Sequence, residues 1–421
     1  MKRILTSLCL ALLPFAAFAV VPHRQTMPKV DGYVLLLGDC HIHTVFSDDT
    51  SWPTTRVDEA AYDGLDFIAI TDHCDTRHQK MVNNGTFNGA KVDRNTSYEI
   101  AAAAAKKYGI LVVHGAELTR GNWMFPGHFN TLFIKDGNRI AIAAEEAADK
   151  AKAEGADAKA QEEAAILAGL AEARAQGGYI QWNHPDWERQ APNETVWWPI
   201  HSQVLDAGLL DGIEIVNRFT GFDPEAFHWC VEKNLNVSAG TDCHKPMFQL
   251  VDYEKGEYRP VTVAFARERS LEGLREAMDN RRCCVIADNC MYGPEDLLKL
   301  FFESAFEISN VKCSAKKCTF NIRNTSSLPF VITKAVDGES SKVSYPRMTI
   351  VNAGEELSWS VTGINNTASF ASQGVEEVTV SFFVENMLCD TGKPIKVSYT
   401  FPLKCCPIRP EPAHSVSVTS R

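Results

Sequence analysis

The chain has 421 residues, of which 45% are hydrophobic and 23% are charged. This length and composition predict a globular protein of two or three domains. The formal net charge of -11 argues against a broad basic surface, so we expect no stable nucleic-acid partner. A small anionic substrate stays compatible with this charge, because bound metals and a few arginines can reverse the local field.

The N-terminus has the pattern of a secretory signal peptide. Lys2 and Arg3 precede an apolar run over residues 4–18, in which Ala17 and the following Ala19 form an A-x-A cleavage signature. We therefore expect cleavage after Ala19 and export to the periplasm or the cell exterior. The alternative is an uncleaved anchor helix, but the run is short for a span of about 20 residues. No later stretch is long and apolar enough to predict a membrane span.

Cysteine usage fits an oxidising compartment, since only Cys9 of the thirteen cysteines precedes the expected cleavage site. Disulfides of unassigned pairing are expected among the late cysteines, which are Cys283, Cys284, Cys290, Cys313, Cys318, Cys389, Cys405 and Cys406. Cys40, Cys74 and Cys243 each lie beside a candidate metal ligand. We interpret them as small buried residues, with soft metal ligands as the alternative.

Residues from about 30 to 290 alternate between short apolar runs and helical stretches. The apolar runs lack strict polar alternation, which is typical of strands buried on both faces. The expected strands cover 33–38, 65–71, 110–115, 129–134, 179–182, 212–216, 236–239 and 261–266. The clearest helices cover 57–63, 98–108, 224–234 and 271–280. This alternation predicts an α/β domain over residues 20–290, built as a parallel barrel.

Two segments depart from this alternation. Residues 142–176 are rich in Ala, Glu and Lys and contain no proline, so helix propensity predicts a helical insertion. We interpret its charged residues as a solvated helix surface, with a lid as the alternative. After about residue 300, short strands are expected at 306–313, 318–323, 330–335, 356–361, 375–384 and 396–403. They predict a small β-sandwich over residues 300–405, followed by a flexible tail over 406–421.

Histidines and carboxylates gather where the expected barrel strands end. His41 and His43 follow the 33–38 strand and point the same way, because alternate residues at a strand end share a face. The other candidates in the same setting are Asp48, His73, Glu117, His128, His184, Asp242 and His244. Carboxyl ends of parallel barrel strands meet at one mouth, which predicts a metal site there. His128 is the exception, because it precedes its strand.

The order of these motifs resembles one known family. H-x-H, S-D, T-D-H, a strand-ending Glu, G-H, N-H-P and D-x-H follow one another, as in the polymerase and histidinol phosphatase (PHP) family, over residues 36–288. The stretches HTVFSDDTSWPTTRVDEA, GLDFIAITDH, PGHFNTLF and WNHPDW further resemble secreted PHP phosphodiesterases with an extra C-terminal β domain, a group that includes enzymes acting on haloalkyl phosphate diesters. The resemblance implies a distorted (β/α)7 barrel that binds two or three divalent metal ions.

The resemblance also implies a ligand set. It assigns one metal to His41, His43, Glu117 and Asp242, a second to Glu117, His128 and His184, and a third to Asp48, His73 and His244. The mixed nitrogen and oxygen donors suit Mn²⁺, Fe²⁺ or Zn²⁺. Where the family usually has S-D-G, this chain has Ser47-Asp48-Asp49, and we choose Asp48 as the ligand. Asp72 and Asn183 are expected to orient the ligands.

A metal-activated water would attack the phosphorus of a small organic phosphate ester, with Glu117 and Asp242 in the catalytic centre. Arg120 and Arg218 follow expected strands and are candidates for binding the phosphate, since arginine binds phosphate in a bidentate manner. Arg77 and Lys80 are further candidates on the loop after His73. A cluster of tryptophans lies among the motif loops, and we hypothesise that it forms an aromatic wall for an apolar arm of a diester: Trp52, Trp182, Trp187, Trp197 and Trp198.

Several alternatives to an exported phosphodiesterase stay open. A metal hydrolase of amides or lactones would use the same barrel, and a phosphomonoesterase would use the same metals. A binding protein without activity, in which the β domain holds a glycan, is a third reading, and a nuclease is a fourth. The oligomeric state is not encoded in any visible motif.

Overall fold

The computed structural model describes residues 23–74, 86–87, 90–91, 93–120, 126–189, 194–364 and 369–403. The expected signal peptide (1–19) and flexible tail (406–421), together with Arg77, Lys80, Cys405 and Cys406, lie outside these ranges. Within them, no helix combines the length and the apolar character needed to cross a membrane.

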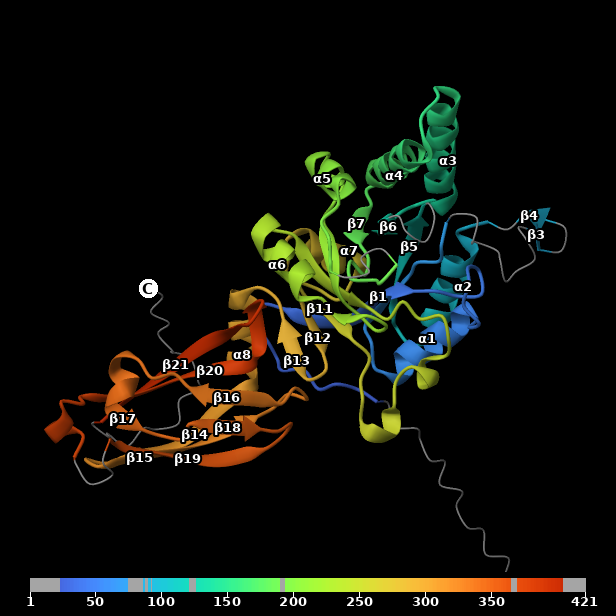
Figure 1. Cartoon of the computed structure of the whole chain (residues 1–421). Helices are drawn as coiled ribbons and strands as arrows, with labels where there is room; N and C mark the ends of the chain where they lie inside the picture. Colours follow the sequence, from blue (N-terminus) through green and yellow to red (C-terminus); the bar gives the residue numbers. More distant parts are fainter. Residues whose placement is uncertain are drawn as a thin grey trace, which may run out of the picture.

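Seven strands form the barrel (Figure 1). In chain order they are β1 (Val34–Ile42), β2 (Phe67–Ile70), β5 (Leu111–Thr119), β6 (His128–Leu132), β7 (Tyr179–Trp182), β8 (Gly212–Asn217) and β10 (Asn236–Gly240). The barrel closes where Ile42 pairs in parallel with Cys243 and the Asp242 amide donates to the His41 carbonyl at 2.8 Å. The barrel is distorted because β6 runs antiparallel to both β5 and β7, while the other pairings are parallel. The expected α/β barrel is confirmed.

Helices cover the barrel: α1 (Pro53–Tyr62), α2 (Thr96–Ala105), α5 (Pro199–Asp206), α6 (Pro224–Lys233) and α7 (Leu271–Asp279). Two of them begin at side-chain caps, where Asp223 accepts from the Glu225 and Ala226 amides and Ser270 accepts from the Gly273 amide. Short elements complete this half: β3 (Thr86–Phe87), β4 (Ala90–Lys91), β9 (Gly221–Phe222), η1 (Met247–Gln249) and η2 (Tyr253–Lys255).

The alanine-rich insertion forms two helices, α3 (Gly137–Ala153) and α4 (Ala158–Ala175), which lie on the side of the barrel away from the C-terminal domain (Figure 1). Asp136 and Asp157 cap their first turns. Ile140 and Ile166 are buried in the same apolar cluster as the β5–β7 strands, while Glu146 is exposed. The predicted helical insertion is confirmed, and its charged face is solvated.

The barrel sheet continues into the C-terminal domain. β11 (Val261–Ala266) pairs with β1, and β12 (Cys283–Ala287) and β13 (Cys290–Tyr292) extend the sheet to β20 (Glu377–Asp390). β20 also pairs with β16 (Phe330–Lys334) and β21 (Lys393–Pro402), and β16 pairs with β18 (Met348–Val351). Although the sequence places a boundary near residue 290, this one sheet crosses it.

A second sheet completes the predicted β-sandwich, in the order β14 (Phe306–Cys313), β15 (Lys317–Asn324), β19 (Glu356–Gly363) and β17 (Val343–Ser344). Helix α8 (Glu295–Ala305) links the two halves of the chain (Figure 1), and the short helices η3 (Gly338–Lys342) and η4 (Ala371–Gln373) lie within the sandwich. The Phe302 ring of α8 lies 4.8 Å from the Phe330 ring and 5.9 Å from the Phe382 ring. Aromatic rings therefore fill the sandwich core.

Cys313 and Cys318 form a disulfide across the β14–β15 hairpin. Within the described residues Cys283, Cys284, Cys290 and Cys389 form no disulfide, contrary to the expectation for these four. Neighbouring strand residues point to opposite faces, so Cys283 and Cys284 are buried in different apolar clusters. Cys40, Cys74 and Cys243 are fully buried, and burial raises the pKa of the Cys243 thiol to about 12. They are small core residues, as predicted.

Candidate metal centre

Nine predicted ligand side chains meet at the barrel mouth, seven of which line a cavity of about 200 Å³. The cavity is lined by Asp48, His73, Glu117, His128, His184, Trp187, Asn217, Phe219, Thr220, Asp242 and His244, and His41 and His43 lie beneath it. The ligands come from the carboxyl ends of β1, β2, β5, β7 and β10, where side chains of parallel strands converge. His128 lies at the start of β6, and it reaches the same mouth because β6 runs in the opposite direction.

His41 and His43 form the deepest group with two carboxylates. Their Nε2 atoms lie 3.2 Å apart. Oδ1 of Asp242 is 3.3 and 3.0 Å from these two nitrogens, and Oε2 of Glu117 is 3.7 and 3.4 Å from them. Both carboxylates therefore lie within 3.7 Å of both imidazole nitrogens.

A second group uses the other oxygen of Glu117. Oε1 lies 3.0 Å from Nδ1 of His128 and 3.8 Å from Nε2 of His184. Glu117 is thus shared between the first two groups, which is the arrangement that the family resemblance implies for this residue.

The third group centres on Asp48, whose Oδ1 lies 3.4 Å from Nε2 of His73 and 3.1 Å from Nε2 of His244. His43 also belongs to it, with Nδ1 at 4.0 Å from Asp48 Oδ1. The choice of Asp48 over Asp49 agrees with this geometry, because Asp49 forms an ion pair with the buried Arg56.

The charges of these groups fit cation ligands. Burial would raise the pKa of the Glu117 carboxyl, but the neighbouring His73 and His128 hold it well below its ordinary value. Burial, together with His244 and His73, lowers the pKa of His43 to about 4, so its imidazole stays neutral. Oε2 of Glu117 and Oδ1 of Asp48 are buried yet accept no well-directed hydrogen bond from the described residues. Imidazole nitrogens and carboxylate oxygens together form the mixed donor set that divalent transition metals prefer.

The backbone is also unusual here. His184 and Asp242 have positive φ angles of 31° and 49°. Non-glycine residues in this region are rare and cluster at functional sites. A Cβ on Gly240 would lie 2.3 Å from the Cβ of His41, so only glycine lets β10 approach β1 this closely.

No family model and no curated protein matches the chain. A solved structure from Bacteroides vulgatus, a two-domain protein containing a predicted PHP-like metal-dependent phosphoesterase, is 33% identical, covers 90% of this chain and 99% of its own, and has a TM-score of 0.76. The chain belongs to the PHP-like metal-dependent phosphoesterases.

Two further solved structures match half of this PHP chain. One is a putative metal-dependent phosphoesterase from Bifidobacterium adolescentis, with a TM-score of 0.34, and the other is an amidohydrolase from Chromobacterium violaceum with bound sulfate and a TM-score of 0.31. Each is 18% identical and covers 50% of this chain and 88% of its own.

Glu214 was missed by the sequence analysis of the PHP site. Its Oε1 lies 3.2 Å from Nδ1 of His41, and its Oε2 accepts from the His184 amide at 2.9 Å and from Asn217 Nδ2 at 3.1 Å. The pairing at Nδ1 turns the Nε2 atom of His41 toward the metal position. A single carboxylate inside the otherwise apolar run Gly212–Val216 was the signal available in the sequence.

The predicted orienting residues of the PHP site lie where they were expected. Asp72 accepts from the Ser47 hydroxyl at 2.7 Å, and that hydroxyl lies 3.1 Å from Nδ1 of His43. Asn183 donates to Oε1 of Glu117 at 3.2 Å. Both contacts fix the direction of a ligand.

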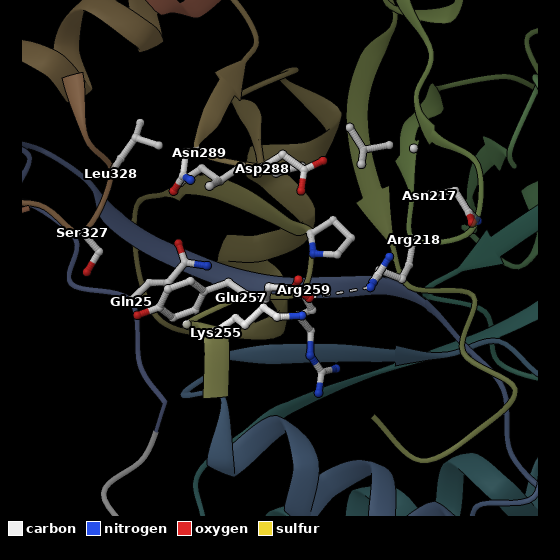
Figure 2. Close-up of a pocket in the computed structure, with 17 residues that line it drawn as sticks. Gln25, Asn217, Arg218, Lys255, Glu257, Arg259, Asp288, Asn289, Ser327 and Leu328 are labelled. Atoms are coloured by element: carbon white, nitrogen blue, oxygen red, sulfur yellow. Dashed lines mark ion pairs between the residues drawn. The ribbon is translucent and has the colours of Figure 1, made fainter. Parts of the chain in front are cut away.

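Neither Arg120 nor Arg218 is among the described residues that line the metal cavity, so their role in phosphate binding stays a prediction. Nε of Arg120 lies 3.3 Å from Glu162 of α4. Arg218 donates to the Leu250 carbonyl and lies 3.9 Å from Glu257. Figure 2 marks the ion pair between Arg218 and Glu257 with a dashed line. Each guanidinium lies beside a carboxylate that is not among the residues lining the cavity.

The expected aromatic wall is smaller than the tryptophan cluster in the sequence. Trp187 lines the cavity, with its ring 5.1 Å from the His128 ring. Trp182 is buried and stacks on Trp229 in the core. Phe219, which the sequence analysis missed, lines the cavity and is 54% exposed. His201 is buried, and its ring stacks on Trp182 with the ring centroids 3.6 Å apart.

Proposed function

We propose that the chain is an exported phosphodiesterase that hydrolyses small organic phosphodiesters with a metal-activated water. The observation that carries this proposal is the convergence of nine histidine and carboxylate side chains, Glu117 among them, at the barrel mouth. In such a cluster one glutamate gives one carboxylate oxygen to each of two groups. This arrangement is suited to binding two or more cations close together.

The metal ligands are the nine predicted residues, and their mixed nitrogen and oxygen donors favour Mn²⁺, Fe²⁺ or Zn²⁺. Bound cations would lower the pKa of water and neutralise the phosphate oxygens. The protein supplies the positions of these ions: Glu117 spans two groups, and Glu214 sets the direction of His41. The geometry requires no covalent protein nucleophile.

The preference for a diester is supported by the aromatic side chains at the cavity. Trp187 and Phe219 both line it, and Phe219 offers a largely exposed face. Ester groups on the phosphate would bury apolar area against these rings, and a diester supplies two such groups where a monoester supplies one.

Export is supported by two features. The first residues combine a basic start, a short apolar run and an A-x-A signature. The Cys313–Cys318 disulfide suits an oxidising compartment. N-terminal sequencing of the protein recovered from a periplasmic fraction tests this proposal, and an intact N-terminus on cytosolic protein would contradict it.

The reaction is tested with bis(p-nitrophenyl) phosphate and protein purified with Mn²⁺, beside a Glu117→Ala variant, with metal analysis of both. We expect turnover by the wild type and a loss of at least about 1,000-fold in the variant, because two metal positions lose a ligand at once. Bound metal without phosphodiester turnover would refute the proposed reaction. Turnover of amides, lactones or monoesters in a parallel panel would then identify the alternative hydrolase.

A further inference from the structure

A second cavity of about 330 Å³ lies beside the metal cavity, between the barrel and the C-terminal domain (Figure 2). We call it the interdomain cleft. Its walls come from Gln25 ahead of β1, the end of β8, the β12–β13 turn and the Ser327–Leu328 segment of the C-terminal domain. Asn217 lines both cavities. The cleft therefore adjoins the metal cavity at this residue.

The cleft presents polar side chains with unused hydrogen-bonding capacity. Gln25 is only 9% exposed, yet its amide forms no hydrogen bond with other described residues. The side chains of Asp288 and Asn289 likewise form none within the described part of the chain, and Figure 2 shows all three on the cleft wall. Gln25 lies buried in the wall, whereas Asp288 and Asn289 are exposed at its rim, so all three can contact a ligand in the cleft.

The cations at the cleft are already neutralised. Arg259 is buried in an ion pair with Asp63, and Arg218 lies beside Glu257. Lys255 lies 2.8 Å from Asp252. The remaining polar side chains include the amides of Gln25 and Asn289, the carboxylate of Asp288 and the hydroxyl of Tyr258, which suit a neutral ligand that both donates and accepts hydrogen bonds.

The β12–β13 turn holds two of these groups in fixed positions. Asp288 and Asn289 form its two-residue loop, with φ angles of 48° and 60°. Consecutive positive φ angles are the signature of a tight hairpin turn. Nδ2 of Asn386, in β20, donates to the Asn289 carbonyl at 2.6 Å. The C-terminal domain therefore clamps the turn and pre-organises the cleft, which lowers the entropic cost of binding.

We propose that the interdomain cleft binds a polyhydroxylated group, such as a sugar ring, that forms one alcohol arm of the phosphodiester. This inference rests on the proposed phosphodiesterase function and names its substrate class. Sugar hydroxyls donate and accept at once, which matches the amides of Gln25 and Asn289 and the carboxylate of Asp288. Asn217 joins the cleft to the metal cavity, so the arm and the phosphate are bound together.

The test uses two p-nitrophenyl phosphodiesters whose second arms have the same ring size. One carries cyclohexylmethanol and the other carries methyl glucoside through its O6 atom. We expect the wild type with Mn²⁺ to hydrolyse the glucoside diester with a kcat/KM about 10-fold to 100-fold higher, because several hydrogen bonds are gained only with this arm. The leaving group is the same, so the difference reports the second arm alone.

The variant Asp288→Gly/Asn289→Gly removes both side chains and keeps the turn, since glycine adopts positive φ readily. It should lose the preference for the glucoside and leave the cyclohexylmethyl diester within about twofold of the wild type. Glu146→Ala, an exposed change on α3, serves as the control and should keep the full preference. Equal kcat/KM for both diesters in the wild type, or an equal loss of both in the glycine variant, would overturn the inference alone. Hydrolysis of neither diester by the wild type would overturn the proposed function and this inference with it.

Discussion

At the barrel mouth the side chains removed from water are imidazoles and carboxylates, whereas in the C-terminal sandwich they are aromatic rings. His41 is fully buried and Glu117 is 1% exposed, as closely covered as Phe302 and Phe330 in the sandwich core. Burial of apolar rings stabilises the fold directly, while burial of charged groups is unfavourable unless they are paired or bind metals. The same degree of burial thus has opposite energetic consequences in the two regions. We therefore expect the sandwich core to stabilise the fold whether or not metal is bound. The stabilising contribution of the barrel mouth should depend on bound cations.

The largest loss of stability is expected from Phe302→Ala, a change in the sandwich core. The ring is fully buried and lies 4.7 Å from the Phe306 ring. Its loss should lower the free energy of unfolding by about 3–5 kcal/mol, through lost burial and a residual cavity. Urea denaturation measures this, and kcat/KM per folded molecule should stay unchanged, because Phe302 is remote in the fold from the mouth. Lost activity at unchanged stability would reverse the roles assigned to the two regions.

Removal of metal should act on the mouth alone. Ions that bind the folded state at a concentration of 100 times their Kd stabilise it by about 2.7 kcal/mol. Protein stripped with a chelator should therefore unfold at lower urea, and Mn²⁺ should restore the midpoint. The Phe302→Ala variant should show the same increment, since distant sites are additive. An identical midpoint with and without Mn²⁺ would argue against a cation-dependent mouth.

A smaller effect is expected from Glu214→Gln, which keeps the size of the side chain but removes its charge. His41 then loses the carboxylate at its Nδ1 atom, so metal affinity should fall by about 10-fold to 100-fold. Titration with Mn²⁺ followed by activity gives the apparent affinity. Glu162→Gln is the matched control, because its carboxylate pairs with Arg120 outside the cavity lining. An equal loss in both variants would indicate a general electrostatic effect.

Arg120→Ala should have the smallest effect. The guanidinium is held by Glu162 of α4, and the exchange of one partly exposed ion pair is worth about 0–1 kcal/mol. The kcat/KM for bis(p-nitrophenyl) phosphate should stay within about threefold of the wild type. A decrease of 100-fold or more would return Arg120 to the role in phosphate binding that its place in the sequence predicted.

Much of the centre could be read from the sequence because barrel geometry is regular. Side chains at the carboxyl ends of parallel strands must meet at one mouth, so the positions of His41, His73 and Asp242 after apolar runs were sufficient. The sandwich followed from short strands separated by turn residues, and the helical insertion followed from alanine-rich composition.

The tertiary structure decided what depends on direction and on distant partners. β6 runs antiparallel, which brings His128 to the mouth from the start of its strand. Arg120 forms an ion pair with Glu162, which lies in α4. Glu214 acquires its role only because β8 lies where its side chain meets His41. The local sequence determines toward which face of a strand a side chain points. The residue that it contacts comes from a segment far away in the chain, so this contact forms only when the barrel closes.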